Sequence, residues 1–401
     1  MGQRLQTAAT SALLLSVLGI VVVGAALGAK SSANGLRTPA SGDVVARVPS
    51  RALDPATKEI ARLHTAIKAG NADPAQALRL ARLHLTEARR TADPRHFGHA
   101  EAVLAPLCGD VANPGALVLR AMVHQARHKF ARSLTDLDRA LALQPMDAQA
   151  WLVRASVLTV VGRYEEAAQS CDKVAQQASR FIATACRAPI DGMLGKAGAT
   201  AAALGAVMNE ANGAGERAWG ASLLGELALW TGDVAAAERW FREALTLDPE
   251  DRYSRSAYAD LLLETGRAKE AHVLLSNAVD DEGLLIRLAL AEQAVGAATV
   301  GQRRNQLRAR FDADRRRGEP VHGREEARFA LFIEKQPKRA LELALENWVL
   351  QHEPWDARLV IEAALAAGQP QAAQPALAWM QATGFEDARL RALATQAERL
   401  Q

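Results

Sequence analysis

Two pairs of histidines have spacings at which helical residues can bind a metal ion. His124 and His128 are four residues apart, and His96 and His99 are three apart. Residues at these spacings lie on one face of a helix. A zinc site needs further ligands, and neither an HExxH motif nor a third ligand at an expected distance accompanies either pair. His124 falls at a packing position of its helix and His128 at a turn, so we predict that all four histidines are structural and that no metal is bound.

The three cysteines, Cys108, Cys171 and Cys186, form no CxxC pair. If two of them bridged, one thiol would be left over, which is unusual for a disulfide scaffold. We therefore predict three small buried side chains, because a free cysteine behaves as a small apolar residue.

Motifs of common enzymes are missing from the sequence. It contains no GxSxG and no Walker-type glycine-rich loop, and no GxGxxG follows a strand, because no segment has a convincing strand pattern. The paired acids Glu165 and Glu166 follow a turn at a helix start, where they favour the helix dipole and need no catalytic role. The sequence therefore predicts a protein that is not an enzyme and needs no cofactor.

A run of arginines is the strongest charged feature. Seven arginines between 303 and 317 stand against only Asp312 and Asp314. They predict either a solvated helix face or a contact with an acidic partner or anionic lipid headgroups, made by Arg303, Arg304, Arg308 and Arg315. Nucleic-acid binding is not expected, since one aromatic residue lies in the run and the net charge of the chain is only +3.

The composition favours packed helices over sheets. Hydrophobic residues make up 49% of the 401 positions but aromatic residues only 4%, with alanine and leucine dominant. Such a chain is too long for one ordinary core but natural for an array of repeats.

A repeated pattern of two short helices organises the chain. The clearest unit, AWGASLLGELALWTGDVAAAERWFREALTLDP at 218–249, has two amphipathic helices separated by Gly232 and ends at Pro249. A similar unit begins at Ala148, with its turn at Gly162. The turns at 128 and 162 are 34 residues apart, as are those at 232 and 266. The pattern resembles the tetratricopeptide repeat.

The resemblance implies an all-α fold, an α-solenoid of stacked antiparallel helix pairs that forms a superhelix with a concave groove. We divide the helical part into six segments, namely degenerate N-terminal repeats (54–113), two sets of clearer repeats (114–183 and 184–285), a degenerate repeat with the arginine-rich helix (286–320), C-terminal repeats (321–387) and a capping helix (388–401). The second set of clearer repeats starts with a unit that begins at Thr184 and has its expected turn at Gly198.

The N-terminal segment predicts a single hydrophobic helix. The run from Ala8 to Ala29 has 22 residues without a charge, and a membrane span needs about 20 apolar residues. We therefore interpret 1–29 as a signal anchor, or alternatively as a cleaved signal peptide, and 30–53 as a flexible linker. The expected location is the inner membrane with the repeats facing the periplasm, or a secreted or periplasmic protein after cleavage.

The resemblance also implies which side chains face the groove. The first helix of each repeat lines the concave side, and its positions 2, 5, 9, 12 and 13 give a partner-binding surface that includes Trp219, Glu226, Trp230, Tyr253, Asp260, Glu264, Trp355 and Glu362. Aromatic residues often dominate binding energy, and acids beside them suit a basic or amine-bearing segment. The alternative is that the aromatic residues pack between repeats and the acids are solvated.

The sequence therefore predicts a membrane-tethered scaffold that binds an unidentified protein through its groove. The alternative is a structural or assembly factor of an envelope complex that acts through its convex face or its arginine-rich helix.

Overall fold

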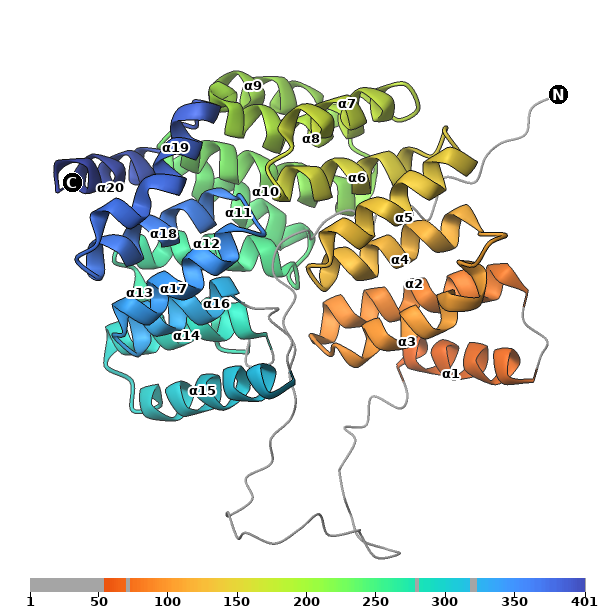
Figure 1. Cartoon of the computed structure of the whole chain (residues 1–401), viewed down its shortest axis with the longest axis horizontal. Coiled ribbons are helices and arrows are strands. Elements are labelled where there is room, and N and C mark those ends of the chain that lie inside the picture. Colours follow the sequence, from red (N-terminus) through yellow and green to blue (C-terminus); the bar gives the residue numbers. More distant parts are fainter. Residues whose placement is uncertain (1–53, 70–72, 278–280, 318–322, 401) are drawn as a thin grey trace, which may run out of the picture.

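The computed structural model describes residues 54–69, 73–277, 281–317 and 323–400, and within these ranges the chain is helical with no strand (Figure 1). The all-α prediction is confirmed. The predicted N-terminal hydrophobic helix and the linker, at 1–53, lie outside the described residues. Among the helices that are described, none combines the length and the apolar character needed to cross a membrane.

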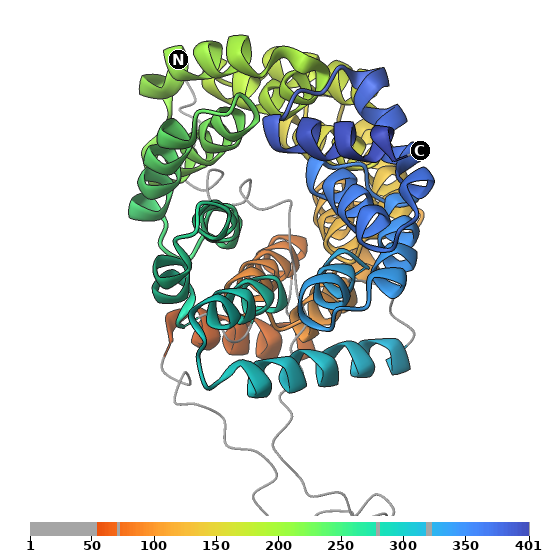
Figure 2. The ribbon, with the colours of Figure 1, turned by 90° about the vertical axis from the view of Figure 1, so that its left-hand side faces the viewer.

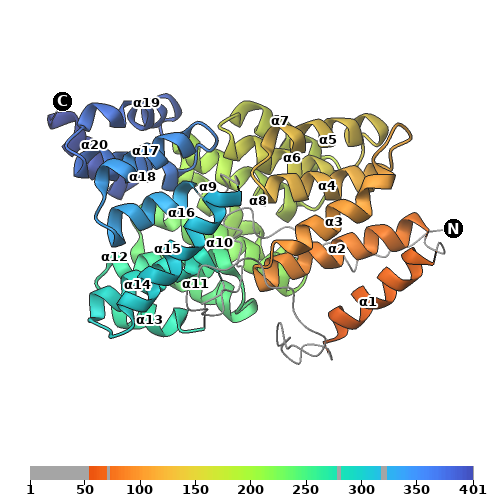
Figure 3. The same cartoon turned by 60° about the horizontal axis from the view of Figure 1, so that its bottom comes forward.

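The helices form antiparallel pairs along the chain (Figures 1 and 3). The first helices of the pairs are α2 (Pro74–Thr91), α4 (Pro114–Ala126), α6 (Ala148–Val160), α8 (Arg180–Asp191), α10 (Gly213–Trp230), α12 (Arg252–Glu264), α14 (Glu282–Val295), α16 (Gly323–Arg328) and α18 (Pro354–Ala366). The second helices are α3 (Arg95–Leu104), α5 (Phe130–Leu143), α7 (Tyr164–Ala175), α9 (Ala197–Val207), α11 (Val234–Leu247), α13 (Ala268–Leu275), α15 (Val300–Arg317), α17 (Pro337–Trp348) and α19 (Gln374–Thr383).

The pairs are flanked by α1 (Pro55–Lys68) and α20 (Ala388–Arg399). Short segments complete several of them, namely η3 (Ala105–Leu107), the π-helical η4 (Gly192–Lys196), η5 (Met208–Glu210), the π-helical η6 (Phe329–Ile333) and η7 (Pro370–Ala373).

Glycines in the left-handed region make the turns between paired helices. Gly162, Gly232 and Gly266 have φ values of +78°, +80° and +74°, which residues with a Cβ rarely adopt. These three turns are where the repeat spacing predicts them. The predicted turn at Gly198 is wrong, because Gly198 lies inside α9 and the chain turns at Gly195, with φ +76°.

Close packing within a pair depends on small residues. In the 218–249 unit, a Cβ placed on Gly225 of α10 would lie 2.6 Å from Cε1 of Phe241 of α11. Phe241 is fully buried, so the missing side chain at 225 lets the phenylalanine ring lie against the neighbouring helix.

The C-terminal repeats lie against repeats from the middle of the sequence, and the helices together surround a central axis (Figure 2). The backbone N–H of His352 donates to the Val160 carbonyl at 2.8 Å. Tyr164 donates its hydroxyl to the His352 carbonyl at 2.9 Å and accepts from Nε1 of Trp379 at 2.7 Å. These bonds hold the α17–α19 region against α6 and α7.

The cysteine prediction needs a correction. Cys171 of α7 and Cys186 of α8 form a disulfide, with their Cα atoms 5.7 Å apart. They lie on adjacent helices of successive repeats, a proximity that their 15-residue separation in the chain does not reveal. Cys108 is a buried free thiol, as predicted.

Candidate functional site

The first helices of several repeats line a cleft inside the superhelix. It has a cavity volume of about 160 Å³ and receives side chains from α2, α4, α6, α8, α10, α12 and α18. Its walls are mainly apolar or aromatic, with Leu152, Met193, Trp219 and Trp230 among them. Cys186 also lines it, so the disulfide braces one wall.

All eight side chains predicted for the groove line one of two cavities. The cleft contains Trp219, Glu226, Trp230, Tyr253 and Trp355. A second cavity, of about 240 Å³, contains Asp260, Glu264, Glu362 and again Trp355. The residues that the repeat register predicts for the groove therefore line cavities of the fold. Their role in binding a partner stays a prediction.

Two carboxyl groups face the cleft from different parts of the chain. Glu226 of α10 is 8% exposed, and Tyr253, the charge of Arg389 and Trp355 all act to lower its pKa. Glu353, at the start of α18, is 6% exposed and accepts from Nη2 of Arg324 at 2.5 Å. Burial raises the pKa of both groups, and the charge of Glu226 contributes to the rise at Glu353.

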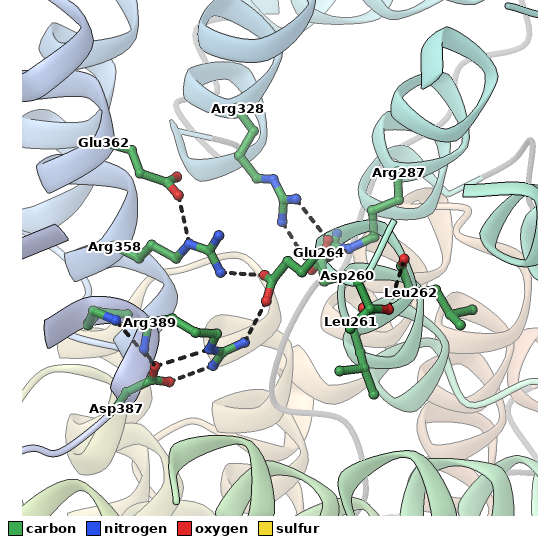
Figure 4. Close-up of polar contacts among 12 residues, drawn as sticks. Asp260, Leu261, Leu262, Glu264, Arg287, Arg328, Arg358, Glu362, Asp387 and Arg389 are labelled. Carbon is green, nitrogen blue, oxygen red and sulfur yellow. Dashed lines mark hydrogen bonds and ion pairs between the residues drawn. The ribbon is translucent and has the colours of Figure 1, made fainter. Parts of the chain in front are cut away.

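The acids of the second cavity are bound by arginines of the same chain (Figure 4). Asp260 is 3% exposed and accepts from Nη2 of Arg287 at 2.6 Å and Nη2 of Arg328 at 2.9 Å. Burial alone would raise the pKa of Asp260, but the two guanidinium groups outweigh it and hold the pKa below its usual value.

The same network joins helices on opposite sides of the superhelix. Glu264 of α12 accepts from Arg358 of α18 and, at 3.2 Å, from Nη1 of Arg389 of α20. Arg358 also donates to Glu362 at 2.8 Å. The expectation that these acids would recognise a basic partner therefore applies less to Asp260, Glu264 and Glu362, which bind arginines directly, than to Glu226, on which Arg389 acts only through its charge.

Trp355 stands between the two cavities. The guanidinium carbons of Arg328, Arg358 and Arg389 lie 5.9, 5.7 and 5.6 Å from the centroid of its ring. These distances are within the range of cation–π attraction, so Trp355 is fixed by its own chain and forms a rigid end of the cleft.

The arginines of α15 pair mostly within the fold. Arg303 lies 3.2 Å from Glu292, Arg308 lies 2.8 Å from Glu334, and Arg315 pairs with Asp312 and Glu326. Arg304 is exposed. These pairs attach α15 to α14 and to the α16–η6 segment, which favours a structural role for much of the charge.

Four histidines meet where α1, α2 and α3 pack together. Nε2 of His84 lies 3.0 Å from Nε2 of His64, and Nδ1 of His84 lies 2.9 Å from Nδ1 of His96. The His99 ring lies beside them and is tilted relative to the His84 ring, with the two centroids 5.3 Å apart. The helical spacing of three residues indicates His96 and His99 in the sequence. It does not indicate His64 and His84, because they lie too far from that pair along the chain for a spacing rule.

The histidine cluster does not converge on one point. His84 uses its two opposite ring nitrogens for its two neighbours, an arrangement that suits N–H···N hydrogen bonds between neutral rings. Over the ranges that the structure describes, no group of three or more His, Cys, Asp or Glu residues is arranged to hold a metal ion. His124, which is also predicted to be structural, is buried, and its Nε2 lies 3.5 Å from Oδ2 of Asp136.

Lowering the pH from 7 to 5 is expected to cost the protein about 2 kcal/mol of stability through His84 alone. Burial, together with His96, His64 and His99, lowers the pKa of His84 to about 3. The unfolded chain therefore binds a proton near its ordinary pKa of about 6.5 while the folded chain does not, and stability falls as the pH drops below that value.

Urea denaturation of the wild type and of the His84→Leu variant at both pH values checks this. The variant should lose about 2 kcal/mol less than the wild type over the same interval. An equal loss in both proteins would contradict the assignment to His84.

Comparisons with known proteins identify the repeats. Two family models, each described as tetratricopeptide repeat, match residues 118–180 and 228–292. The chain contains tetratricopeptide repeats. The matched ranges cover α5, α6 and α7 and then α11, α12 and α13, together with parts of the neighbouring helices. Tetratricopeptide repeats stack into superhelices with extended concave binding surfaces and generally serve as scaffolds for protein–protein interaction.

Solved structures with similar helical arrays include a human IFIT1 dimer with PPP-AAAA, which is 12% identical over 80% of this chain and 76% of that chain, with a TM-score of 0.47. The P58(IPK) TPR domain is 19% identical over 82% and 98% of the two chains, with a TM-score of 0.25. A tetratricopeptide repeat protein from Parabacteroides merdae is 13% identical over 86% and 98%, with a TM-score of 0.26.

Because these TM-scores are all below 0.5, the two family matches, and not these structures, identify the repeats. Comparison with curated protein sequences gives no match.

Proposed function

We propose that this chain is a non-enzymatic scaffold, tethered to a membrane by residues 8–29, that binds a segment of a protein partner in the cleft of its tetratricopeptide repeats. The observation that carries the proposal is the convergence of Trp219, Trp230, Tyr253 and Trp355 on one cleft, from the successive first helices α10 and α12 and from α18, which is distant from them in sequence. Aromatic side chains in a concave apolar site are typical anchors for a partner.

The disulfide supports the export of the repeats. Structural disulfides form and persist in oxidising compartments such as the bacterial periplasm and are rare in the cytosol. The Cys171–Cys186 bridge therefore agrees with repeats that face the periplasm, in line with the 22-residue run without charge at 8–29.

The alternative, an assembly factor that acts through the arginine-rich helix, is less favoured. Three of its four proposed contact residues, Arg303, Arg308 and Arg315, form ion pairs with acids of the same chain. A partner would have to displace those acids before it could use the charge.

Replacing Trp219 by alanine is expected to reduce the capture of the partner at least tenfold, because truncating an aromatic anchor typically costs more than about 1.4 kcal/mol of binding energy. The measurement is quantitative mass spectrometry of proteins crosslinked to the full chain in its native envelope. Trp240→Ala is the matched control, since Trp240 lies on the second helix α11 and outside the cleft. Equal capture by the two variants, with equal folding, would count against the cleft.

Deleting residues 1–29 is expected to move the protein from the membrane fraction to the soluble fraction, because this segment contains the apolar run long enough to anchor the chain. Alkaline carbonate extraction followed by immunoblotting measures the distribution. If the full chain is itself extracted as a soluble protein, the tether is excluded.

A further inference from the structure

The cleft has the size of one side chain. A cavity of about 150 Å³ with apolar walls is large enough to hold a benzene molecule, and the volume of this cleft is about 160 Å³. The space therefore suits a single anchoring group better than a whole helix. Leu152, Met193, Trp219 and Trp230 supply an apolar surface along which a carbon chain can lie.

The polar end of this space carries excess negative charge. Glu226 and Glu353 both line it, and each is more than nine-tenths buried. Asp356 lies beside Glu353, and Arg324 pairs with both of them, so these two carboxyl groups share one guanidinium, and the charge of Glu226 acts on Glu353 as well. Arg89, from α2, is a further lining residue, which leaves the lining itself with two carboxyls and one guanidinium.

The partners of Glu226 leave it able to accept a charged donor. Tyr253 and Trp355, two of its polar neighbours, are neutral, and Arg389, the cation whose charge acts on Glu226, is itself paired with Asp387 and Glu264. A carboxyl group in this position gains most from a cation, because an ion pair formed out of water is screened much less than one on the surface. The aromatic rings of Trp219 and Trp230 line the same space and favour a cation over an anion.

We propose that the cleft binds a primary ammonium group on an apolar stem, namely a lysine side chain of the partner, with the ammonium between Glu226 and Glu353 and the stem against Trp219 and Trp230. This inference rests on the proposed function of the cleft and names the chemistry of the group that it holds. An ammonium has three donors, enough to contact both carboxyls at once.

The test uses the full-length protein and two small probes that differ only in their head group. n-Pentylammonium reproduces the lysine stem and charge, and 1-pentanol keeps the stem without the charge. Binding is followed by tryptophan fluorescence, which Trp219 and Trp230 report from inside the cleft. We expect saturable binding of pentylammonium and at least tenfold weaker binding of pentanol, since hydrogen bonds to charged groups are the stronger ones.

The Glu226→Gln variant keeps the shape of the side chain and an acceptor oxygen but removes the charge. It should bind pentylammonium at least tenfold more weakly and pentanol as the wild type does. Glu250→Gln is the matched control, because that side chain is 77% exposed, and it should leave both affinities unchanged. A second measurement on the wild type alone, calorimetry in two buffers of different ionisation enthalpy, should show protons released on binding pentylammonium, because burial raises the pKa of Glu353 and Glu226.

Equal affinities for pentylammonium and pentanol would overturn the ammonium inference and leave a cleft for apolar groups, so the scaffold proposal would stand. No saturable binding of either probe would also overturn it. The scaffold proposal itself fails only if partner capture is insensitive to Trp219→Ala, a result that is independent of both probes.

Discussion

The Asp260→Asn variant is expected to be less stable than the wild type by about 3–5 kcal/mol, because removing one member of a buried ion pair leaves its partner charged and out of water. Asp260 is bound by Arg287 from α14 and Arg328 from α16. Both guanidinium groups would keep their charge, since arginine stays protonated in proteins. The loss is therefore larger than the net contribution of the two ion pairs to the native state.

Urea denaturation followed by far-UV circular dichroism measures this loss. Asp138→Asn makes the same chemical change in an exposed pair, where Asp138 is 61% exposed and lies 2.9 Å from Arg154. Exposed pairs contribute about 0–1 kcal/mol, so the control variant should be nearly as stable as the wild type. Similar losses in the two variants would show that the Asp260 cluster is not the buried junction described above.

The short-range features of the fold could be predicted from the sequence. The turns at Gly162, Gly232 and Gly266 follow from a local need for positive φ and from a constant repeat length. The side chains that face the cavities also follow from the repeat, because position within a first helix fixes direction once the pairs are stacked. Trp219 and Trp355, 136 residues apart, could therefore be assigned to one surface without knowledge of the cavity that both of them line.

The closure of the superhelix could not be predicted in this way. Trp379 donates to Tyr164 across 215 residues, and Arg389 reaches Glu264 across 125. Such contacts depend on the accumulated rotation of many repeats, a quantity that local patterns do not contain. The same reason explains why the acids at 260, 264 and 362 were expected to be open to a partner, although the chain supplies their arginines itself.

The disulfide was missed for a related reason. A pairing between Cys171 and Cys186 requires the second half of α7 and the middle of α8 to face each other, which depends on how successive repeats pack and not on any CxxC signature. An odd number of cysteines argued against a scaffold of several bridges, but it does not exclude one bridge with one buried thiol.

Replacing both bridged cysteines, Cys171→Ala with Cys186→Ala, is expected to lower the free energy of unfolding by about 3 kcal/mol, the amount expected for closing a loop of about 15 residues in the unfolded chain. Equilibrium urea denaturation with and without reductant measures the effect. The wild type should lose stability in reductant, since its unfolded state is then no longer crosslinked, whereas the double variant should give the same midpoint under both conditions.

Cys108→Ala is the control for this experiment. It removes the free thiol and leaves the bridge, so its midpoint should respond to reductant as the wild type does. If the wild-type midpoint were the same in both conditions, the bridge would not form in solution, and the support that it gives to an oxidising compartment would be lost. A response confined to the two proteins that keep Cys171 and Cys186 would instead link the stability of the cleft wall to the redox state of the compartment, because Cys186 lines that wall.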